Sequence, residues 1–199
     1  MEKKYELLTD QTIQVDGRTL YRIRALRDVG MVKAGSIGGY VESEDNLSHF
    51  DDCWIYKNAK VYGGARITKS AEVRGAAQVY ERAMVSDHAN VSGKARVYGS
   101  AAVFGEARVA GICFLFGAAH IYCDAVLKTT SDYLTIGPIG SEEGVLTAWR
   151  DSLWGVMVNR GCFIGTLREF ENEVKALHAD NIHGIMYGHA IAMIKAALA

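Results

Sequence analysis

Small and aliphatic residues recur along the middle of the chain with a period of six. Residues 53–130 divide into thirteen consecutive hexapeptides of the form A-x-V-x-G-x, without an insertion. The first positions are all small: Cys53, Ala59, Ala65, Ala71, Ala77, Ala83, Ala89, Ala95, Ala101, Ala107, Cys113, Ala119 and Ala125. The third positions are all aliphatic: Ile55, Val61, Ile67, Val73, Val79, Val85, Val91, Val97, Val103, Val109, Leu115, Ile121 and Leu127. Such self-similarity indicates a repeat architecture.

A strict period of six does not fit an amphipathic helix, whose apolar residues recur every 3.6 positions. It predicts short extended segments that each turn two side chains inward and are joined by corners. Three hexapeptides close a coil of 18 residues, and successive coils stack through parallel backbone hydrogen bonds about 4.8 Å apart. Glycine in the fifth position suits corners that need a positive φ. We therefore expect a mainly β protein built on a left-handed parallel β-helix of about four to five coils.

Residues 18 positions apart lie above one another in such a fold, so the outward side chains sort into three faces. The first face carries the aromatic column, which consists of Tyr62, Tyr80, Tyr98 and Phe116, and beside it Arg96. An exposed apolar stripe often marks an interface, but stacked rings can also serve only to stabilise neighbouring strands. The column is therefore interpreted as a subunit interface, a stabilising ladder or a ligand platform. A threefold assembly would suit a triangular prism.

The two ends of the chain depart from the repeat. Residues 1–46 predict a hairpin with strands at 12–15 and 20–25 around Asp16-Gly17. The open end of a β-helix must be covered to prevent edge pairing, so we expect 1–46 to form an N-terminal β cap. The repeat domain would then span 47–130, with Leu47 already in register. Residues 131–199 would form a small C-terminal α+β unit.

In this C-terminal unit, segments 133–136, 145–150 and 153–158 are interpreted as short strands. Thr166 and Glu169 have the spacing of a capping box that opens a helix. A second helix is expected to start near Asp180 or Asn181 and to run toward Ala197. The helical residues expected to face inward are Leu167, Phe170, Val174 and Leu177 in the first helix, and Ile185, Met186, Ala190 and Ile194 in the second.

A glycine-containing loop in the same unit is a candidate anion-binding site. Its residues Gly137, Gly140 and Ser141 could present backbone N–H groups to an anion, with Arg150 and Arg160 near in sequence. The alternative is a turn that merely joins two strands.

The cysteines and histidines do not indicate a metal site. Cys53 and Cys113 fall in the small inward position and are interpreted as small hydrophobic residues. Cys162 belongs to 161–165, which predicts a tight strand-to-helix connection and offers no evident base partner. His178, His183 and His189 are spaced so that they do not share a helical face, and they are interpreted as surface residues. No C-x-x-C pair or zinc-type spacing occurs.

Composition narrows the class of partner and the compartment. The formal net charge is −1 and the pI is near 6.6, so nucleic acid is not the expected partner. The sequence contains no run of 18 apolar residues, so it predicts no membrane span. Lys3 and Lys4 are not followed by the apolar core of a signal peptide. Four cysteines without such a signal are typical of reduced thiols. We expect a cytoplasmic protein.

Three resemblances extend this picture. The hexapeptides resemble the left-handed β-helix of hexapeptide-repeat acyltransferases. Segments 32–35, 38–48 and 52–56 look like the YdcK-like family, whose members are labelled as transferases without a secure activity. The tail, from the stretch 135–141 through Gly161-Cys162-Phe163 to Glu169-Phe170, is similar to the ends of proteins encoded by phages and prophages. These resemblances imply the fold and a phage association in a host cytosol, and they carry over no catalytic residue.

Three functions compete. The first is a non-catalytic binding protein that forms a dimer or trimer and obstructs or sequesters a host component such as a defence system. Its partner would be a host protein, or a small anion bound near Arg96 or residues 137–141. The second is an acyltransferase that uses coenzyme A, with His88 as the general base. Against it, no loop interrupts the thirteen hexapeptides. A structural role is the third. The binding protein, without a cofactor, is the function we expect.

Overall fold

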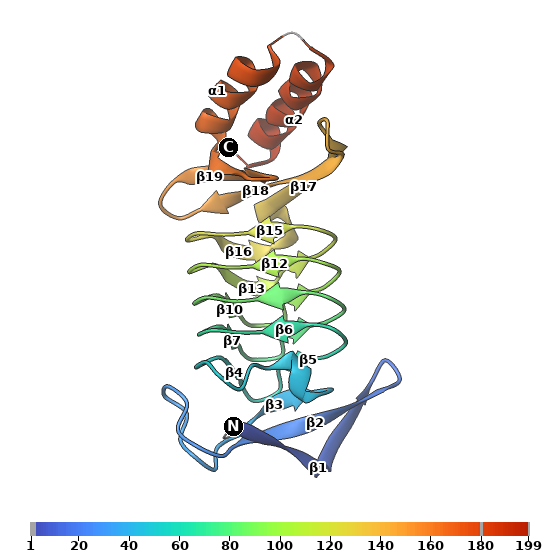
Figure 1. The fold of residues 1–199 in the computed structure, drawn as a ribbon, viewed down its shortest axis with the longest axis vertical. Helices are drawn as coiled ribbons and strands as arrows, with labels where there is room; N and C mark the ends of the chain where they lie inside the picture. Colours follow the sequence, from blue (N-terminus) through green and yellow to red (C-terminus); the bar gives the residue numbers. More distant parts are fainter. Residues whose placement is uncertain (1–2, 180, 199) are drawn as a thin grey trace.

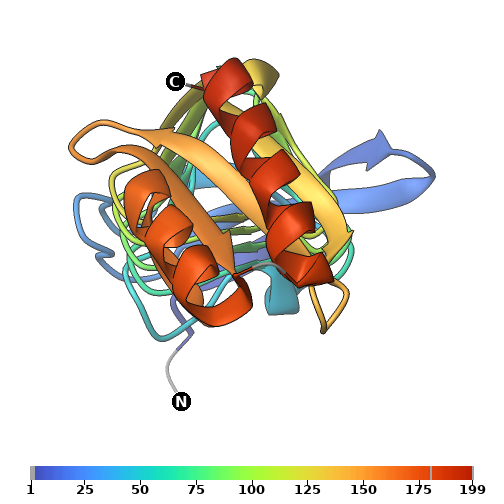
Figure 2. The ribbon, with the colours of Figure 1, turned by 90° about the horizontal axis from the view of Figure 1, so that it is seen from above.

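The chain forms a column in which a β-solenoid joins a hairpin at one end to two helices at the other (Figure 1). We describe it from a computed structural model, which covers residues 3–179 and 181–198. The protein is mainly β, and the solenoid has about 5 turns. Seen along the column in Figure 2, the coils lie over one another and the two helices lie side by side above them. The expected repeat architecture is confirmed.

Three parallel sheets form the walls of the solenoid. The first wall contains β3 (Ile37–Val41), β5 (Lys60–Val61), β8 (Gln78–Val79), β11 (Arg96–Val97) and β14 (Phe114–Leu115). The second contains β4 (Trp54–Ile55), β7 (Glu72–Val73), β10 (Asn90–Val91), β13 (Arg108–Ile112) and β16 (Val126–Thr129). The third contains β6 (Arg66–Ile67), β9 (Met84–Val85), β12 (Ala102–Val103) and β15 (His120–Ile121). Short 3₁₀ turns, η1 (Glu44–Asn46) and η2 (Thr130–Asp132), adjoin this region.

The register between coils is the one that the repeat predicts. Val61 pairs with Val79, Val79 pairs with Val97, and the other walls keep the same step of 18 residues. The small and aliphatic inward residues of all thirteen hexapeptides are buried. Because each inward side chain lies directly above its counterpart in the coil below, the walls enclose one continuous apolar core.

Every corner in the fifth hexapeptide position from residue 57 to residue 123 has a positive φ. Seven of these corners are glycines, as the sequence predicts. The other five are Lys57, Lys69, Glu81, Asp87 and Cys123. The sequence does not indicate these five, because side-chain residues in this conformation are disfavoured by about 1–2 kcal/mol each. The stacking of the coils therefore imposes the corner geometry regardless of the residue.

Acidic side chains stabilise several corners through hydrogen bonds. Glu81 accepts a hydrogen bond from the backbone N–H of Gly99 (2.8 Å), and Asp87 accepts one from Gly105 (3.1 Å). In both pairs the carboxylate reaches the corner of the next coil, 18 residues on. Each bond satisfies a backbone donor that faces outward and lacks a ladder partner at the corner.

The N-terminal hairpin continues one wall of the solenoid. Strands β1 (Tyr5–Val15) and β2 (Arg18–Ala25) pair antiparallel around Asp16-Gly17, as expected. Strand β3 then pairs antiparallel with β2 and parallel with β5, so the seven strands form one sheet. Leu47 faces Ile67, a step of 20 residues rather than 18. Leu47 thus occupies an inward position, but two additional residues separate it from the regular repeat.

The C-terminal unit is a four-stranded antiparallel sheet that carries two helices. Its elements are β17 (Tyr133–Ile139), β18 (Gly144–Asp151), β19 (Gly155–Arg160), β20 (Phe163–Thr166), α1 (Leu167–His178) and α2 (Ile182–Leu198). Thr166 caps α1, and its backbone N–H donates to Glu169 Oε2 at 2.7 Å, which confirms the capping box. Trp149 of β18 belongs to the solenoid core, whereas Leu146 of the same strand belongs to a second core beneath the helices.

Several expectations for this unit are wrong in detail. The segment 161–165 is a turn followed by the fourth strand, β20, rather than a direct connection to the helix. The expected strand at 153–158 begins at Gly155, because residues 152–154 form the turn before it. Leu177, Ile185 and Met186 were expected inside but are exposed. Asp180 lies outside the described residues.

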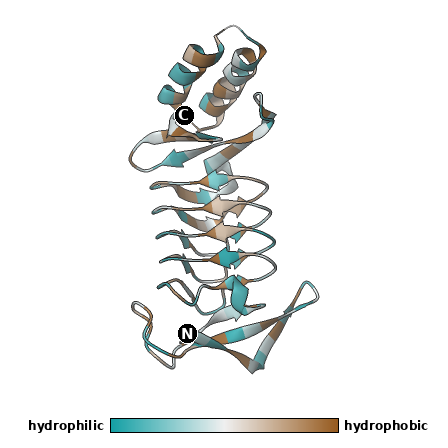
Figure 3. Ribbon diagram, viewed as in Figure 1, coloured by the Kyte–Doolittle hydropathy of each residue, from teal (hydrophilic) through white to brown (hydrophobic). Residues whose placement is uncertain are grey.

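The inward stripe of α2 is displaced from the expected one. Tyr187, Ala190, Ile194 and Leu198 are buried against the sheet and α1. Since almost all of α2 is apolar, its periodicity does not distinguish the buried stripe from the exposed one. Figure 3 shows apolar colour on the ribbons of both helices. Among the described residues, no helix combines the length and the hydrophobicity needed to cross a membrane.

Two corner glycines test the stacking of the coils. Gly99 and Gly117 have φ values of 74° and 68°, but only at Gly99 would an added Cβ meet backbone, at 2.8 Å from the Gly117 oxygen. We predict that Gly117→Ala lowers the free energy of unfolding by about 1 kcal/mol and Gly99→Ala by roughly 2–4 kcal/mol. Urea unfolding followed by circular dichroism measures both. Equal losses would show that corner contact does not hold the register.

Candidate functional site

The aromatic column is a continuous stack of rings on the first wall. Ring centroids are 5.1 Å apart for Tyr62 and Tyr80, 5.0 Å for Tyr80 and Tyr98, and 5.6 Å for Tyr98 and Phe116. The first two pairs are parallel to within 5°. The column therefore stabilises the stacked coils, which is one of the three roles expected for it.

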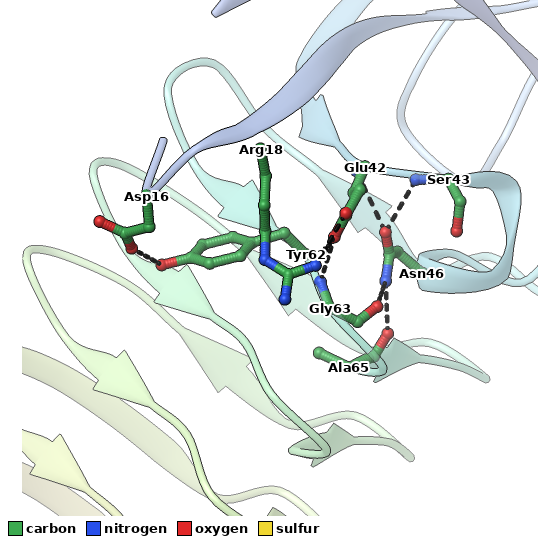
Figure 4. Close-up of polar contacts among 8 residues, drawn as sticks. All are labelled: Asp16, Arg18, Glu42, Ser43, Asn46, Tyr62, Gly63 and Ala65. Atoms are coloured by element: carbon green, nitrogen blue, oxygen red, sulfur yellow. Dashed lines mark hydrogen bonds and ion pairs between the residues drawn. The ribbon is translucent and has the colours of Figure 1, made fainter. Parts of the chain in front are cut away.

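The N-terminal end of the column is covered. Tyr62 is only 4% exposed, and its hydroxyl donates to Asp16 Oδ2 of the hairpin turn at 3.2 Å (Figure 4). Burial, followed by the nearby Asp16 carboxylate, raises the pKa of the Tyr62 hydroxyl. Arg18 on the same hairpin pairs with Glu42, and Glu42 accepts from the Gly63 N–H at 2.6 Å. Tyr62 is thus a structural residue rather than part of an open surface.

Asn46 links the first two coils of the solenoid through hydrogen bonds to the backbone of both. It is fully buried, and its Oδ1 accepts from the backbone N–H groups of Glu42 and Ser43. Its Nδ2 donates to the carbonyl oxygens of Gly63 and Ala65, each at 2.9 Å (Figure 4). All the polar atoms of the amide are therefore satisfied by backbone. Sequence reasoning did not single out Asn46, since an asparagine between strands usually indicates a turn.

The C-terminal end of the column is open. Phe116 is 43% exposed, and Phe114 and Ile112 beside it are exposed as well. We call these three residues the aromatic patch. Arg96 lies one coil below, with its guanidinium carbon 5.8 Å from the Phe114 ring centroid. At the upper edge Tyr133 meets Phe116 edge-on at 6.4 Å, and its hydroxyl donates to the Phe114 carbonyl. The patch combines fixed rings with a neighbouring cation.

The candidate anion-binding residues do not come together as expected. Gly140 and Arg160 are neighbours: a Cβ on Gly140 would lie 3.0 Å from Arg160 Nη2. Arg150, however, lies at the opposite end of β18 from Gly144, the residue that pairs with the end of β17. Its Nε donates to the Leu198 carbonyl at 3.1 Å. Arg150 therefore fastens the end of α2 and contributes nothing to the loop, because the intervening stretch of strand spans roughly 20 Å.

A cavity of about 470 Å³ opens beside Arg160. Its lining residues are Ser141, Glu142, Arg160, Gly161, Cys162, Phe163, Phe170, Glu173, Val174, Leu177, His178 and Tyr187. They come from the β17–β18 turn, the hairpin of β19 and β20, α1 and α2. Of the expected anion-binding set, only Ser141 and Arg160 line it. From the sequence, Phe170, Val174 and Leu177 were interpreted as helix packing, and Phe163 as part of the connection before the helix.

The cysteines and His88 have the following surroundings. Cys53 and Cys113 are fully buried in the solenoid core, as expected, and burial raises the pKa of the Cys113 thiol to about 12. The exposed Cys162 lies on the cavity wall. His88 is exposed at a corner and lines none of the three cavities that we located. Its role as the base of an acyltransferase stays a hypothesis.

A buried lysine is a further residue that the sequence did not reveal. Lys4 Nζ is enclosed at the first coil, where it donates to the carbonyl oxygens of Asp51 (2.7 Å) and Cys53 (2.9 Å). Burial lowers the pKa of this amine. Lys4 thus satisfies carbonyl groups at the end of the solenoid, where no further coil supplies donors.

Comparison with known proteins adds no constraint on the function. A scan against protein-family models finds no match to the chain, and a search of curated proteins finds none either. Within residues 3–179 and 181–198, no group of three or more His, Cys, Asp or Glu side chains is arranged to hold a metal ion.

Replacing Asn46 tests the junction between the first two coils. In Asn46→Asp, a carboxylate of nearly the same shape would face two carbonyl oxygens without a hydrogen to donate. We predict a loss of roughly 3 kcal/mol or more in the free energy of unfolding at pH 7. The loss relative to wild type should shrink as the pH falls, because protonation of the introduced carboxylate restores one donor.

The matched control is Asn90→Asp, which makes the same change on an outer face, where Asn90 donates to Glu72 at 3.2 Å. Its cost should be about 1 kcal/mol or less. Chemical unfolding at pH 7 and pH 5 measures both variants. Equal losses for the two variants would contradict the structural role of Asn46.

Proposed function

We propose that the protein is a non-catalytic binding protein that assembles through its first wall and obstructs or sequesters a host component. The observation that carries this proposal is the aromatic patch of Ile112, Phe114 and Phe116 at the open end of the ring stack. Exposed aromatic residues grouped on one face are the kind of surface that forms the centre of protein interfaces.

The rings of the patch are held in place before any partner arrives. Phe116 is stacked on Tyr98 from below and touched by Tyr133 from above. Ordering a side chain on binding costs about 0.5–1.5 kcal/mol, and a ring that is already ordered avoids most of that cost. Arg96 adds a charged group at the margin, where arginine is enriched in interfaces. These features favour a protein partner over a purely structural ladder.

The first partner that we propose is another copy of the same chain. The solenoid presents three similar walls, and the aromatic rings of the patch lie on only the first of them, so a dimer or a trimer would bury one patch per chain. Closed point-group symmetry is the common outcome for a chain that associates with itself. Such an assembly would leave the C-terminal units of its chains free to meet a host component.

The hand and the ends of the solenoid belong to the same proposal. A left-handed coil is supported by the period of six without insertions. The continuous sheet from β1 to β14 and the buried Lys4 support a capping role for the residues before the solenoid. Trp149, which lies in the solenoid core, supports a capping role for the C-terminal unit. Covered ends keep repeat proteins from associating edge to edge.

The phage association rests on the resemblance of the tail, from the stretch 135–141 to Glu169-Phe170. A phage-borne protein of this kind would act in the host cytosol on a host protein, such as a component of a defence system. This step is an analogy between families rather than an inference from a site. It identifies the compartment in which a partner should be sought.

A charge on the aromatic patch tests the assembly. In Phe116→Glu, like charges from each copy would meet at the interface, and we predict that the protein becomes monomeric. Met84→Glu is the control, because Met84 is similarly exposed (40%) but lies on the third wall. Light scattering coupled to size-exclusion chromatography measures the mass. A wild-type monomer, or a mass that Phe116→Glu leaves unchanged, would overturn the proposed interface.

A further inference from the structure

Arg160 is a buried cation with incomplete pairing. Its side chain is 9% exposed, and its Nη2 donates to the Ile139 carbonyl at 2.6 Å. Within the described part of the chain, Nε is buried and has no hydrogen-bond partner. The nearest carboxylate is Glu142, whose Oε2 is 3.9 Å from Nη1 but whose side chain is 81% exposed. A buried guanidinium normally has its donors satisfied, so this group is suited to an anion that enters the cavity.

The fold holds the guanidinium in this position. Gly140 and Gly144 flank it, and a Cβ on Gly144 would lie 2.7 Å from Nη1. A Cβ on Gly140 would lie too close to both Arg160 Nη2 and the Tyr187 hydroxyl. The two glycines therefore let the turn between β17 and β18 close tightly over Arg160. The arginine is preorganised on a rigid strand, which is the condition for selective anion recognition.

The remaining walls of the cavity are mainly apolar. Phe163 and Phe170 lie with their ring centroids 5.2 Å apart, and Val174 and Leu177 of α1 continue the wall. His178 and Tyr187 also line the cavity, with their rings 5.5 Å apart. A concave pocket of a few hundred cubic ångströms with mainly apolar walls and a few placed polar groups is typical of a small-molecule site.

We propose that this cavity binds a small organic monoanion, with its carboxylate on Arg160 and its apolar or aromatic body against Phe163 and Phe170. Arg160 lines the cavity, and two adjacent N–H groups of a guanidinium fork can meet the two oxygens of a carboxylate. Two further carboxylates line the cavity, on Glu142 and the exposed Glu173. They would repel a ligand with several negative charges, and this argues against nucleoside polyphosphates.

This site is separate from the aromatic patch, so the failure of one proposal leaves the other intact. Phe116 lies on the first wall of the solenoid, whereas the cavity is lined only by residues of the C-terminal unit. Binding can therefore be measured on the full chain whatever its oligomeric state.

Calorimetric titration with matched acids and amides tests the proposal. The probes are phenylacetate, indole-3-acetate and hexanoate, each compared with its neutral amide, together with AMP and ATP. We expect at least one acid to bind at least tenfold more tightly than its amide and more tightly than ATP. Arg160→Gln should weaken binding of that acid at least tenfold. Arg150→Gln should leave it unchanged, because Arg150 lies outside the cavity.

Glu142→Gln keeps the test decisive if Arg160→Gln fails to fold. Glu142 is exposed, so its replacement should leave the fold intact, and removal of a competing carboxylate should tighten binding of the acid about threefold or more. Tight binding of ATP, equal affinity of every acid and its amide, or no binding of any acid at 10 mM (roughly the limit of useful affinity) would overturn the proposal. Weaker binding of the acid by Glu142→Gln would overturn it too.

Discussion

The rest of the structure depends on the contact between corners of successive coils. At Gly99 the backbone of one corner lies so close to the next that an added Cβ would be 2.8 Å from the Gly117 oxygen. Such contact tolerates only one backbone conformation, which is why Glu81 and Asp87 adopt the positive φ of their glycine counterparts. Corners that coincide keep the step at 18 residues. That step places valine over valine inside and tyrosine over tyrosine outside.

This constant register keeps the coils aligned up to the C-terminal end of the molecule, where the aromatic patch and the cavity lie. Strand β17 links them: Tyr133 at its start touches Phe116 of the aromatic patch, and Ile139 at its end accepts from Arg160 beside the cavity. Each coil contacts only its neighbours, so stability in a solenoid is built from local interfaces. The N-terminal residues Asn46 and Lys4 belong to the same scheme, since they satisfy backbone groups where the regular ladder begins.

The sequence predicted the solenoid because its signal is repeated: every inward position from Ile55 to Leu127 obeys one rule. It did not predict the cavity, because that site combines residues from turns and helices that are far apart in the sequence. Arg150 and Arg160 looked equivalent in sequence, yet one fastens α2 and the other lines the cavity. Helix α2 was assigned the wrong inward stripe, since nearly every position is apolar and tertiary packing alone selects Tyr187 over Met186.

Native mass spectrometry of the protein, taken directly from a bacterial lysate, tests the central claim that this column is an oligomeric binding scaffold. We expect complexes that contain two or three copies of the chain, alone or with a bound host protein. A single chain at micromolar concentration, with no added mass, would contradict it.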